Sequence, residues 1–274
     1  MILSLQDVSV FANDRKILNA FSLSVKKGDI LLIVGPSGAG KSTLLNFIAG
    51  FIAVKNNSSK YKWFAGINTS LKAKGNLLYQ NTDITNYLPE TREFSMIGQK
   101  HNVYPHMNVF ENIGYPLKLK KVEESIIDVK VKKLANMVKL PETLWNNKVS
   151  TLSGGEQQRV AIAKALAKNG YIGLLDESFS HLDPLLREDL TELFFTAISQ
   201  KESNLDTILM VSHDWSDIQY ATKVILVVDG SDTSENVIEF ILKNEGFKTL
   251  SKLDTEVKVR WGKEINQAYV RSLA

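Results

Sequence analysis

The sequence predicts an α/β fold built around a mostly parallel sheet. Four apolar runs suit buried strands, and each ends at a glycine or a polar residue: 30–34, 171–175, 207–212 and 224–228. Residues 43–49 and 160–167 suit helices. In an open parallel sheet the carboxyl ends of the strands border one crevice, so the ligand-binding residues are expected there.

The most specific motif is GPSGAGKST at 35–43, which fits GxxxxGK[ST] between a strand pattern and a helix pattern. Glycines allow backbone N–H groups to turn towards a phosphate chain. Lys41 is expected to reach the β- and γ-phosphates, and Ser42 to ligate Mg²⁺. The motif predicts an ATP–Mg²⁺ site with a loop of Gly35, Pro36, Ser37, Gly38, Ala39, Gly40, Lys41, Ser42 and Thr43. The alternative is a glycine turn with a surface lysine.

Polar residues also follow other predicted strands. Asp176 and Glu177 follow one of them, and in a nucleotide enzyme the first would hold Mg²⁺ while the second faces a water. The alternative is an acidic helix start, which favours the helix dipole. His213 follows the run at 207–212. Phe94, Met96 and Ile97 predict a strand that ends at Gly98-Gln99. Together with the glycine loop, these residues predict one ATP–Mg²⁺ site.

A second glycine-rich segment begins at Ser153. Ser153 to Glu156 has the S-x-x-E form of a capping box, followed by a helical pattern. A helix N-terminus that opens with Gly154 and Gly155 offers a second surface for an anion. A plain capped helix explains these residues equally well.

The N-terminal part predicts a small antiparallel sheet. Residues 3–10 and 20–25 alternate between apolar and polar side chains, and Asn13 and Asp14 supply a turn. Phe11 precedes this turn, and its ring either stacks on a nucleotide base or lies in the core. By itself the residue favours the core, because buried aromatic side chains are common.

Composition restricts the class of protein. The chain has 274 residues and a net charge of +3, which gives no argument for nucleic-acid binding from bulk electrostatics. With no cysteine, disulfides and thiolate catalysis are excluded. No signal peptide and no apolar run of about 20 residues is present. We therefore expect a soluble protein that reaches a membrane only through a partner.

Four further segments carry expectations about the fold. The polar stretch at 55–75 predicts a surface loop. Residues 123–139 predict a basic helix on which Ile126 and Val129 have helical spacing, with a solvated face as the simplest interpretation. Ser234 to Gly246 predicts a capped amphipathic helix, and alternation over 255–261 predicts a half-buried strand.

At LSGGEQQR (152–159) the sequence resembles the ATP-binding cassette family. The other motifs stand in that family's order: the phosphate loop at 35–43, the Q-loop glutamine Gln99, the signature at 152–156, the Walker B run at 171–177, the D-loop at 180–183 and the H-loop histidine His213. The resemblance covers residues 1–230. It implies a P-loop NTPase core with an inserted helical subdomain over about 100–168, a surface insertion at 55–75 and a small C-terminal appendage at 231–274.

The resemblance also implies a role for each residue. Phe11 matches the aromatic residue that stacks on adenine, which reverses the preference for the core. Glu177 corresponds to the general base, Gln99 touches Mg²⁺ or the attacking water, and His213 contacts the γ-phosphate. Ser42, Gln99 and Asp176 are the expected metal ligands. Ser153, Gly154 and Gly155 contact ATP held by a second copy, and Asp183 connects the two sites.

Two residues depart from the family pattern. Ser178 stands where proline usually follows the glutamate, and His181 stands where the D-loop usually has a small residue. Neither removes an expected ligand, but both bear on the coupling between sites.

The resemblance implies an ATPase subunit of an importer. Segments such as DITNYLPETR (83–92) are similar to binding-protein-dependent importer ATPases. The implied partners are a second ATP-binding subunit in a homodimer, integral membrane permease subunits and a solute-binding protein, at the cytoplasmic face of the membrane. The alternatives are an exporter or lipid-handling ATPase, and a soluble ATPase that acts on nucleic acid or ribosomes.

Overall fold

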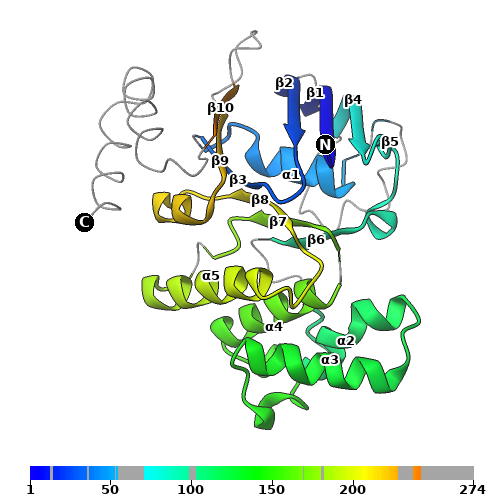
Figure 1. Cartoon of the computed structure of the whole chain (residues 1–274), viewed down its shortest axis with the longest axis vertical. Coiled ribbons are helices and arrows are strands. Elements are labelled where there is room, and N and C mark those ends of the chain that lie inside the picture. The colour runs from blue at the N-terminus through cyan, green and yellow to red at the C-terminus, as the bar shows by residue number, and fades with distance from the viewer. Residues whose placement is uncertain are drawn as a thin grey trace. The chain divides into compact units, whose positions relative to one another are not determined.

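The computed structural model describes residues 1–12, 15–35, 37–52, 54, 71–98, 103–168, 170–179, 182–227 and 237–241 (Figure 1). The chain divides into two compact units. The first comprises Met1–Arg92 and Thr207–Ala274, and the second comprises Glu93–Asp206. Each unit is described by itself below. Among the described residues, no helix has the length and apolar composition needed to cross a bilayer.

The first unit contains the predicted antiparallel sheet. Its strands are β1 (Leu3–Ala12), β2 (Arg15–Val25), β4 (Leu71–Tyr79) and β5 (Thr82–Asp83), in the order β2-β1-β4-β5. Residues 71–75 of the expected surface loop therefore belong to a strand, while 55–70 lie outside the described residues. Gly75 has φ +95° where β4 passes β1, and a Cβ there would lie 2.6 Å from the Asp7 carbonyl oxygen.

The first unit also contains parallel strands that lead to the glycine loop. β3 (Ile30–Val34) pairs in parallel with β8 (Thr207–Val211) on one side and β9 (Lys223–Val227) on the other. The short helix η5 (Trp215–Tyr220) connects β8 to β9, and α1 (Lys41–Ala49) follows the loop. These strands confirm the predicted α/β class, because fully apolar runs are typical of strands covered on both faces.

The helix predicted over 234–246 is wrong for its central residues. Val237–Ile241 form strand β10, which pairs antiparallel with β9 in the register Val237↔Val227. The sequence VIEFI is rich in β-branched and aromatic residues, which suit a strand beside an available sheet edge. The strand predicted over 255–261 lies outside the described residues.

Where the structure describes it, the second unit combines two parallel strands with four α-helices. β6 (Phe94–Ile97) pairs in parallel with β7 (Ile172–Asp176). The helices are α2 (Val109–Leu119), α3 (Glu124–Met137), α4 (Gly154–Ala167) and α5 (Pro184–Ser199). α2, α3 and α4 pack against one another (Figure 1). The implied helical subdomain falls inside this unit. Single 3₁₀ turns lie at Pro89–Thr91 in the first unit, and at Glu142–Leu144 and Val149–Thr151 in the second.

The basic helix α3 packs through one face and exposes the other. Ile127, Val131 and Leu134 are buried, whereas Ile126 and Val129 are exposed. The solvated face that the sequence predicts is therefore the one that carries Ile126 and Val129.

Arg92 anchors the C-terminal end of α1 in the first unit. The side chain is 4% exposed and donates hydrogen bonds to four backbone carbonyls, of Phe47, Ile48, Thr85 and Tyr87. The last carbonyls of a helix have no partner within the helix, and a cation at that end also complements the helix dipole. Burial lowers the pKa of Arg92 to about 10, so the guanidinium remains charged at neutral pH.

We expect Arg92→Met to lower the free energy of unfolding by about 3 kcal/mol, because three buried carbonyls and a part-buried one lose a charged donor. Urea unfolding followed by circular dichroism measures the change. Lys132→Met is the matched control. Lys132 makes an exposed ion pair with Asp128, so its loss should cost below about 0.5 kcal/mol. Equal effects in the two variants would contradict the anchoring role of Arg92.

Candidate functional site

The glycine loop leaves β3 in a conformation that depends on its glycines. Gly38 and Gly40 have φ of +85° and +92°, values that L side chains rarely adopt. A Cβ on Gly40 would lie 2.9 Å from Leu18 Cδ2. A Cβ on Gly35 would lie 2.2 Å from the Val227 carbonyl oxygen of β9. The loop therefore runs against its own unit too closely for a side chain at either position.

Lys41 begins α1 and is 5% exposed. Its Nζ donates a hydrogen bond of 2.8 Å to the Gly35 carbonyl oxygen, so the side chain folds back over the loop. Gly40 is the N-cap of α1, and no side chain caps that end of the helix. An uncapped helix N-terminus beside a loop lysine is a suitable site for a phosphate group.

His213 lies at the same sheet edge as the glycine loop. In the parallel pair β3–β8, Ile33 is opposite Val211, so Gly35 and His213 each follow two residues later. The Ser212 backbone N–H donates a hydrogen bond to the Ile33 carbonyl oxygen. Within the first unit, the two strand ends that the sequence predicted to meet therefore lie on neighbouring strands.

Phe11 lies near the end of β1 and is half-buried rather than part of the core. Its sheet neighbours are Lys16 on β2 and Lys72 on β4. The Lys74 Nζ lies 5.8 Å from the centroid of the ring, within the range of a cation–π contact. The preference for the core that the residue alone suggested is wrong, because the ring remains partly accessible.

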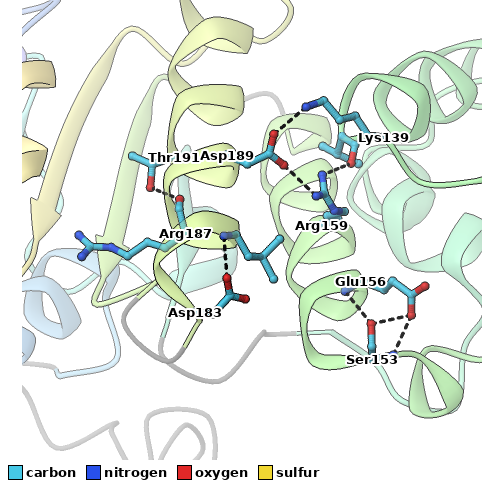
Figure 2. A network of polar contacts seen from close by, with 10 residues as sticks. Lys139, Ser153, Glu156, Arg159, Asp183, Arg187, Asp189 and Thr191 are labelled. Atoms are coloured by element: carbon cyan, nitrogen blue, oxygen red, sulfur yellow. Dashed lines mark hydrogen bonds and ion pairs between the residues drawn. The ribbon is translucent and has the colours of Figure 1, made fainter.

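The signature segment forms the predicted capping box at the start of α4 (Figure 2). The Ser153 Oγ accepts a hydrogen bond of 3.3 Å from the Glu156 backbone N–H and donates one of 2.7 Å to Glu156 Oε2. Glu156 Oε2 also accepts a hydrogen bond of 2.8 Å from the Ser153 backbone N–H. The helix thus holds its own Glu156 carboxylate on the serine hydroxyl and backbone N–H, as a capping box does.

The two signature glycines have different surroundings. A Cβ on Gly154 would meet no atom within 4 Å, whereas a Cβ on Gly155 would lie 2.7 Å from Leu186 Cδ2. Gly155 therefore lets α4 and α5 approach each other. Asp183, from the implied D-loop, is the N-cap of α5, and its Oδ1 accepts from the Leu186 N–H at 3.1 Å.

Asp189 joins α5 to the segments around the signature helix (Figure 2). Its two oxygens accept hydrogen bonds from Lys139 Nζ at 2.6 Å and from Arg159 at 2.8 Å. These bonds lower the pKa of the Asp189 carboxyl, so its contribution to stability is present at neutral pH and is lost as the pH falls through that lowered pKa.

Asp176 and Glu177 occupy the end of β7 in the second unit. Asp176 is the last residue of the strand and is 7% exposed. Glu177 has φ +47°, a left-handed conformation that is uncommon for a residue other than glycine. A buried carboxylate beside a constrained one fits the chemistry expected at this position, namely a metal ligand next to a group that orients water.

The expected site residues divide between the two units. The first unit holds Phe11, the loop residues and His213, while the second holds Ser153, Gly154, Gly155, Asp176, Glu177 and Asp183. Gln99 and Pro36 lie outside the described residues, as do Ser180 and His181 of the D-loop. Sequence reasoning missed the anchoring role of Arg92, which ends the importer-like segment at 83–92 but to which no role was assigned there.

The residues present fit ATP and Mg²⁺. A loop without room for side chains at Gly35 and Gly40, with Lys41 folded over it, suits a phosphate chain. The hydroxyl of Ser42 and the carboxylate of Asp176 are oxygen ligands of the kind that Mg²⁺ prefers. A phosphate loop, strand-end carboxylates and a strand-end histidine define a nucleotide-binding P-loop protein of the cassette class.

Comparison with known proteins identifies the family. Residues 18–180 match the ABC transporter family, and this chain belongs to it. It is 37% identical over 229 residues to the spermidine/putrescine import ATP-binding protein PotA of Thermotoga maritima, covering 83% of this chain and 56% of the relative. It is 38% identical over 215 residues to the thiamine import ATP-binding protein ThiQ of Escherichia coli K12, covering 77% and 82%. The chain thus spans little more than half the length of the PotA relative.

Solved structures share the fold. The dimeric ATP-binding cassette MJ0796 bound to ADP and phosphate superposes with a TM-score of 0.70 at 26% identity, covering 89% of this chain and all of that one. The ADP conformation of the cassette MJ1267 gives 0.69 at 26% identity, over 96% and 99%.

We expect Lys41→Met to weaken ATP binding by about tenfold to 150-fold, because a charge-assisted hydrogen bond to phosphate is worth roughly 1.5–3 kcal/mol. Titration of a fluorescent ATP analogue measures the affinity. Lys26→Met is the matched control on an exposed lysine of the same unit, and it should bind the analogue like the wild type. Unchanged affinity in Lys41→Met would argue against the phosphate role of the loop.

Proposed function

We propose that this chain is the ATP-hydrolysing subunit of an importer whose membrane-spanning subunits are separate chains. The observation that carries the proposal is the glycine loop with Lys41 folded over it at the start of α1. Membership of the ABC transporter family supports ATP as the nucleotide. The relatives PotA and ThiQ, both named import ATP-binding proteins, support import.

The first unit binds the nucleotide. The Phe11 ring stacks on adenine, and the backbone N–H groups of the loop and of the α1 N-terminus hold the phosphates. Lys41 exchanges its bond to the Gly35 carbonyl for the β- and γ-phosphates. His213, at the neighbouring strand end, donates to the γ-phosphate and stabilises the charge that develops on it.

Hydrolysis requires a water aligned with the γ-phosphorus. Glu177 accepts a hydrogen bond from that water and takes up its proton as the oxygen attacks. Ser42, Gln99 and Asp176 would hold Mg²⁺, which would supply positive charge to the phosphates when bound. The left-handed backbone conformation of Glu177 sets the direction in which its side chain leaves the backbone. This limits the positions that the carboxylate can sample.

The signature segment serves ATP held by a second copy of the chain. Ser153, Gly154 and Gly155 present donors at the N-terminus of α4, and the Ser153 hydroxyl leaves Glu156 to contact the γ-phosphate. Asp183, at the N-cap of α5, connects the two sites. The dimeric state of the neighbour MJ0796 supports a homodimer.

Transport follows from opening and closing of this dimer. ATP favours the closed state because the γ-phosphate contacts both copies, and hydrolysis removes that difference in contacts. The movement is transmitted to integral membrane permease subunits, with a solute-binding protein delivering the solute. The chain acts at the cytoplasmic face of the membrane, held there by its partners.

We expect Glu177→Gln to lower kcat for ATP hydrolysis by at least about 100-fold, since it removes the general base. The affinity for ATP should stay within about twofold of the wild type, because the Glu177 carboxylate acts on the attacking water and the contacts to ATP are retained. Phosphate release and titration of a fluorescent ATP analogue measure the two quantities. Glu192→Gln, an exposed glutamate of α5, is the matched control and should hydrolyse ATP normally. Normal turnover in a folded Glu177→Gln protein would contradict the enzymatic role.

The import assembly is tested by capture from membranes of the native cell. Tagged Glu177→Gln protein is incubated with detergent-solubilised membranes and ATP, and the bound proteins are identified by mass spectrometry. We expect a protein with several membrane spans, at a level that exceeds capture without nucleotide. Recovery of a dimer of this chain alone, or of RNA and ribosomal proteins, would overturn the importer assignment while leaving the ATP site intact.

A further inference from the structure

Ser178, one of the two residues that depart from the family pattern, makes two hydrogen bonds in the interior of the second unit. Its Oγ donates to the Ile97 carbonyl oxygen at 2.6 Å, and its carbonyl oxygen accepts from Gln158 Nε2 at 2.8 Å. Ser178 is 8% exposed and Gln158 is fully buried. Both bonds are therefore shielded from competing water, which strengthens them.

These bonds connect three elements at the residue that follows Glu177. Ile97 ends β6, Gln158 belongs to the signature helix α4, and Ser178 lies two residues beyond the end of β7. Proline at this position would restrict its own φ but would supply no donor to β6. Serine thus replaces a covalent restriction with a hydrogen bond to a neighbouring strand.

The backbone of Glu177 gives these bonds a consequence for function. A glutamate with φ +47° persists only where the surroundings over-determine it, because the left-handed region is unfavourable for side chains with a Cβ. The Ser178 hydroxyl and the Ser178 carbonyl, which belongs to the peptide with Phe179, are both held. The two bonds restrain the Cα of Ser178, to which the peptide from Glu177 is attached. The direction in which the Glu177 side chain leaves the backbone is set by that peptide.

We propose that Ser178 and Gln158 are positioning residues for hydrolysis, which hold the turn after β7 so that the Glu177 carboxylate keeps one placement. This inference rests on the proposed function, in which Glu177 is the general base. It assigns to α4 a second task besides presenting the signature. The helix fixes the turn that carries the base of its own chain, through Gln158, one turn after its N-terminus.

The test compares Ser178→Ala with Ser95→Ala in the full chain. Ser95 is a buried residue of β6. Its hydroxyl has no hydrogen-bond partner in the part of the chain that the structure describes. We expect Ser178→Ala to lower kcat about tenfold to 100-fold with the KM for ATP within about twofold, since a displaced base costs turnover rather than binding. Ser95→Ala should keep the wild-type kcat.

A second variant tests the inference in case Ser178→Ala fails to fold. A double variant tests whether Ser178 acts through Glu177. Gln158→Met keeps the side-chain length without the donor, and it should give the same split between kcat and KM. Single-turnover hydrolysis of radiolabelled ATP is then measured for Glu177→Gln with and without Ser178→Ala. Equal residual rates would show that Ser178 acts through Glu177. Melting temperatures of all variants report whether the fold is kept.

Two results would overturn the inference and leave the proposed function standing. One is a kcat for Ser178→Ala equal to that of Ser95→Ala while Glu177→Gln is inactive. The other is that Ser178→Ala lowers the hydrolysis rate by the same factor whether residue 177 is glutamate or, in Glu177→Gln, glutamine. Normal turnover in Glu177→Gln would instead remove the proposed base and the inference with it.

Discussion

The close approach of the β9 backbone to the glycine loop constrains the first unit. A Cβ on Gly35 would lie 2.2 Å from the Val227 carbonyl oxygen, which is fixed by the parallel pairing of β3 with β9. Backbone atoms in a paired strand cannot give way as the end of a side chain can. The glycine therefore allows β9 to run beside β3 to its end while the chain turns into a phosphate loop.

The loop is also held through the helix that follows it. At the N-terminus of α1, Gly40 adopts a left-handed conformation and no side chain caps the helix. A helix N-terminus of this kind favours an anion. At the C-terminus, Gly50 is left-handed as well, and a Cβ there would lie 2.8 Å from Arg92 Nε. Arg92 thus supports the phosphate loop from the far end of the helix, without a place in the site.

In the second unit, α4 is the helix that contacts several of the candidate functional segments. Its N-terminus holds the Glu156 carboxylate on Ser153, and Gly155 admits Leu186 of α5. Further along the helix, Arg159 reaches Asp189 and Gln158 reaches Ser178. A displacement of α4 would therefore act on the α5 contact and on the turn after Glu177 together, which suits an element that responds to a second copy of the chain.

The α/β class, the strand at 30–34, the strand that ends at Gly98-Gln99, the capped helix at Ser153 and the family were predictable from the sequence, because they depend on local patterns and on motifs with fixed spacing. Prediction failed at Val237–Ile241, where an apolar segment that fits either period became a strand beside β9. Which groups the Arg92 and Ser178 side chains donate to became visible only in the folded chain, since these acceptors are backbone carbonyls. Every residue offers a carbonyl, so no side-chain pattern marks it, and only the folded chain decides which one a buried donor reaches.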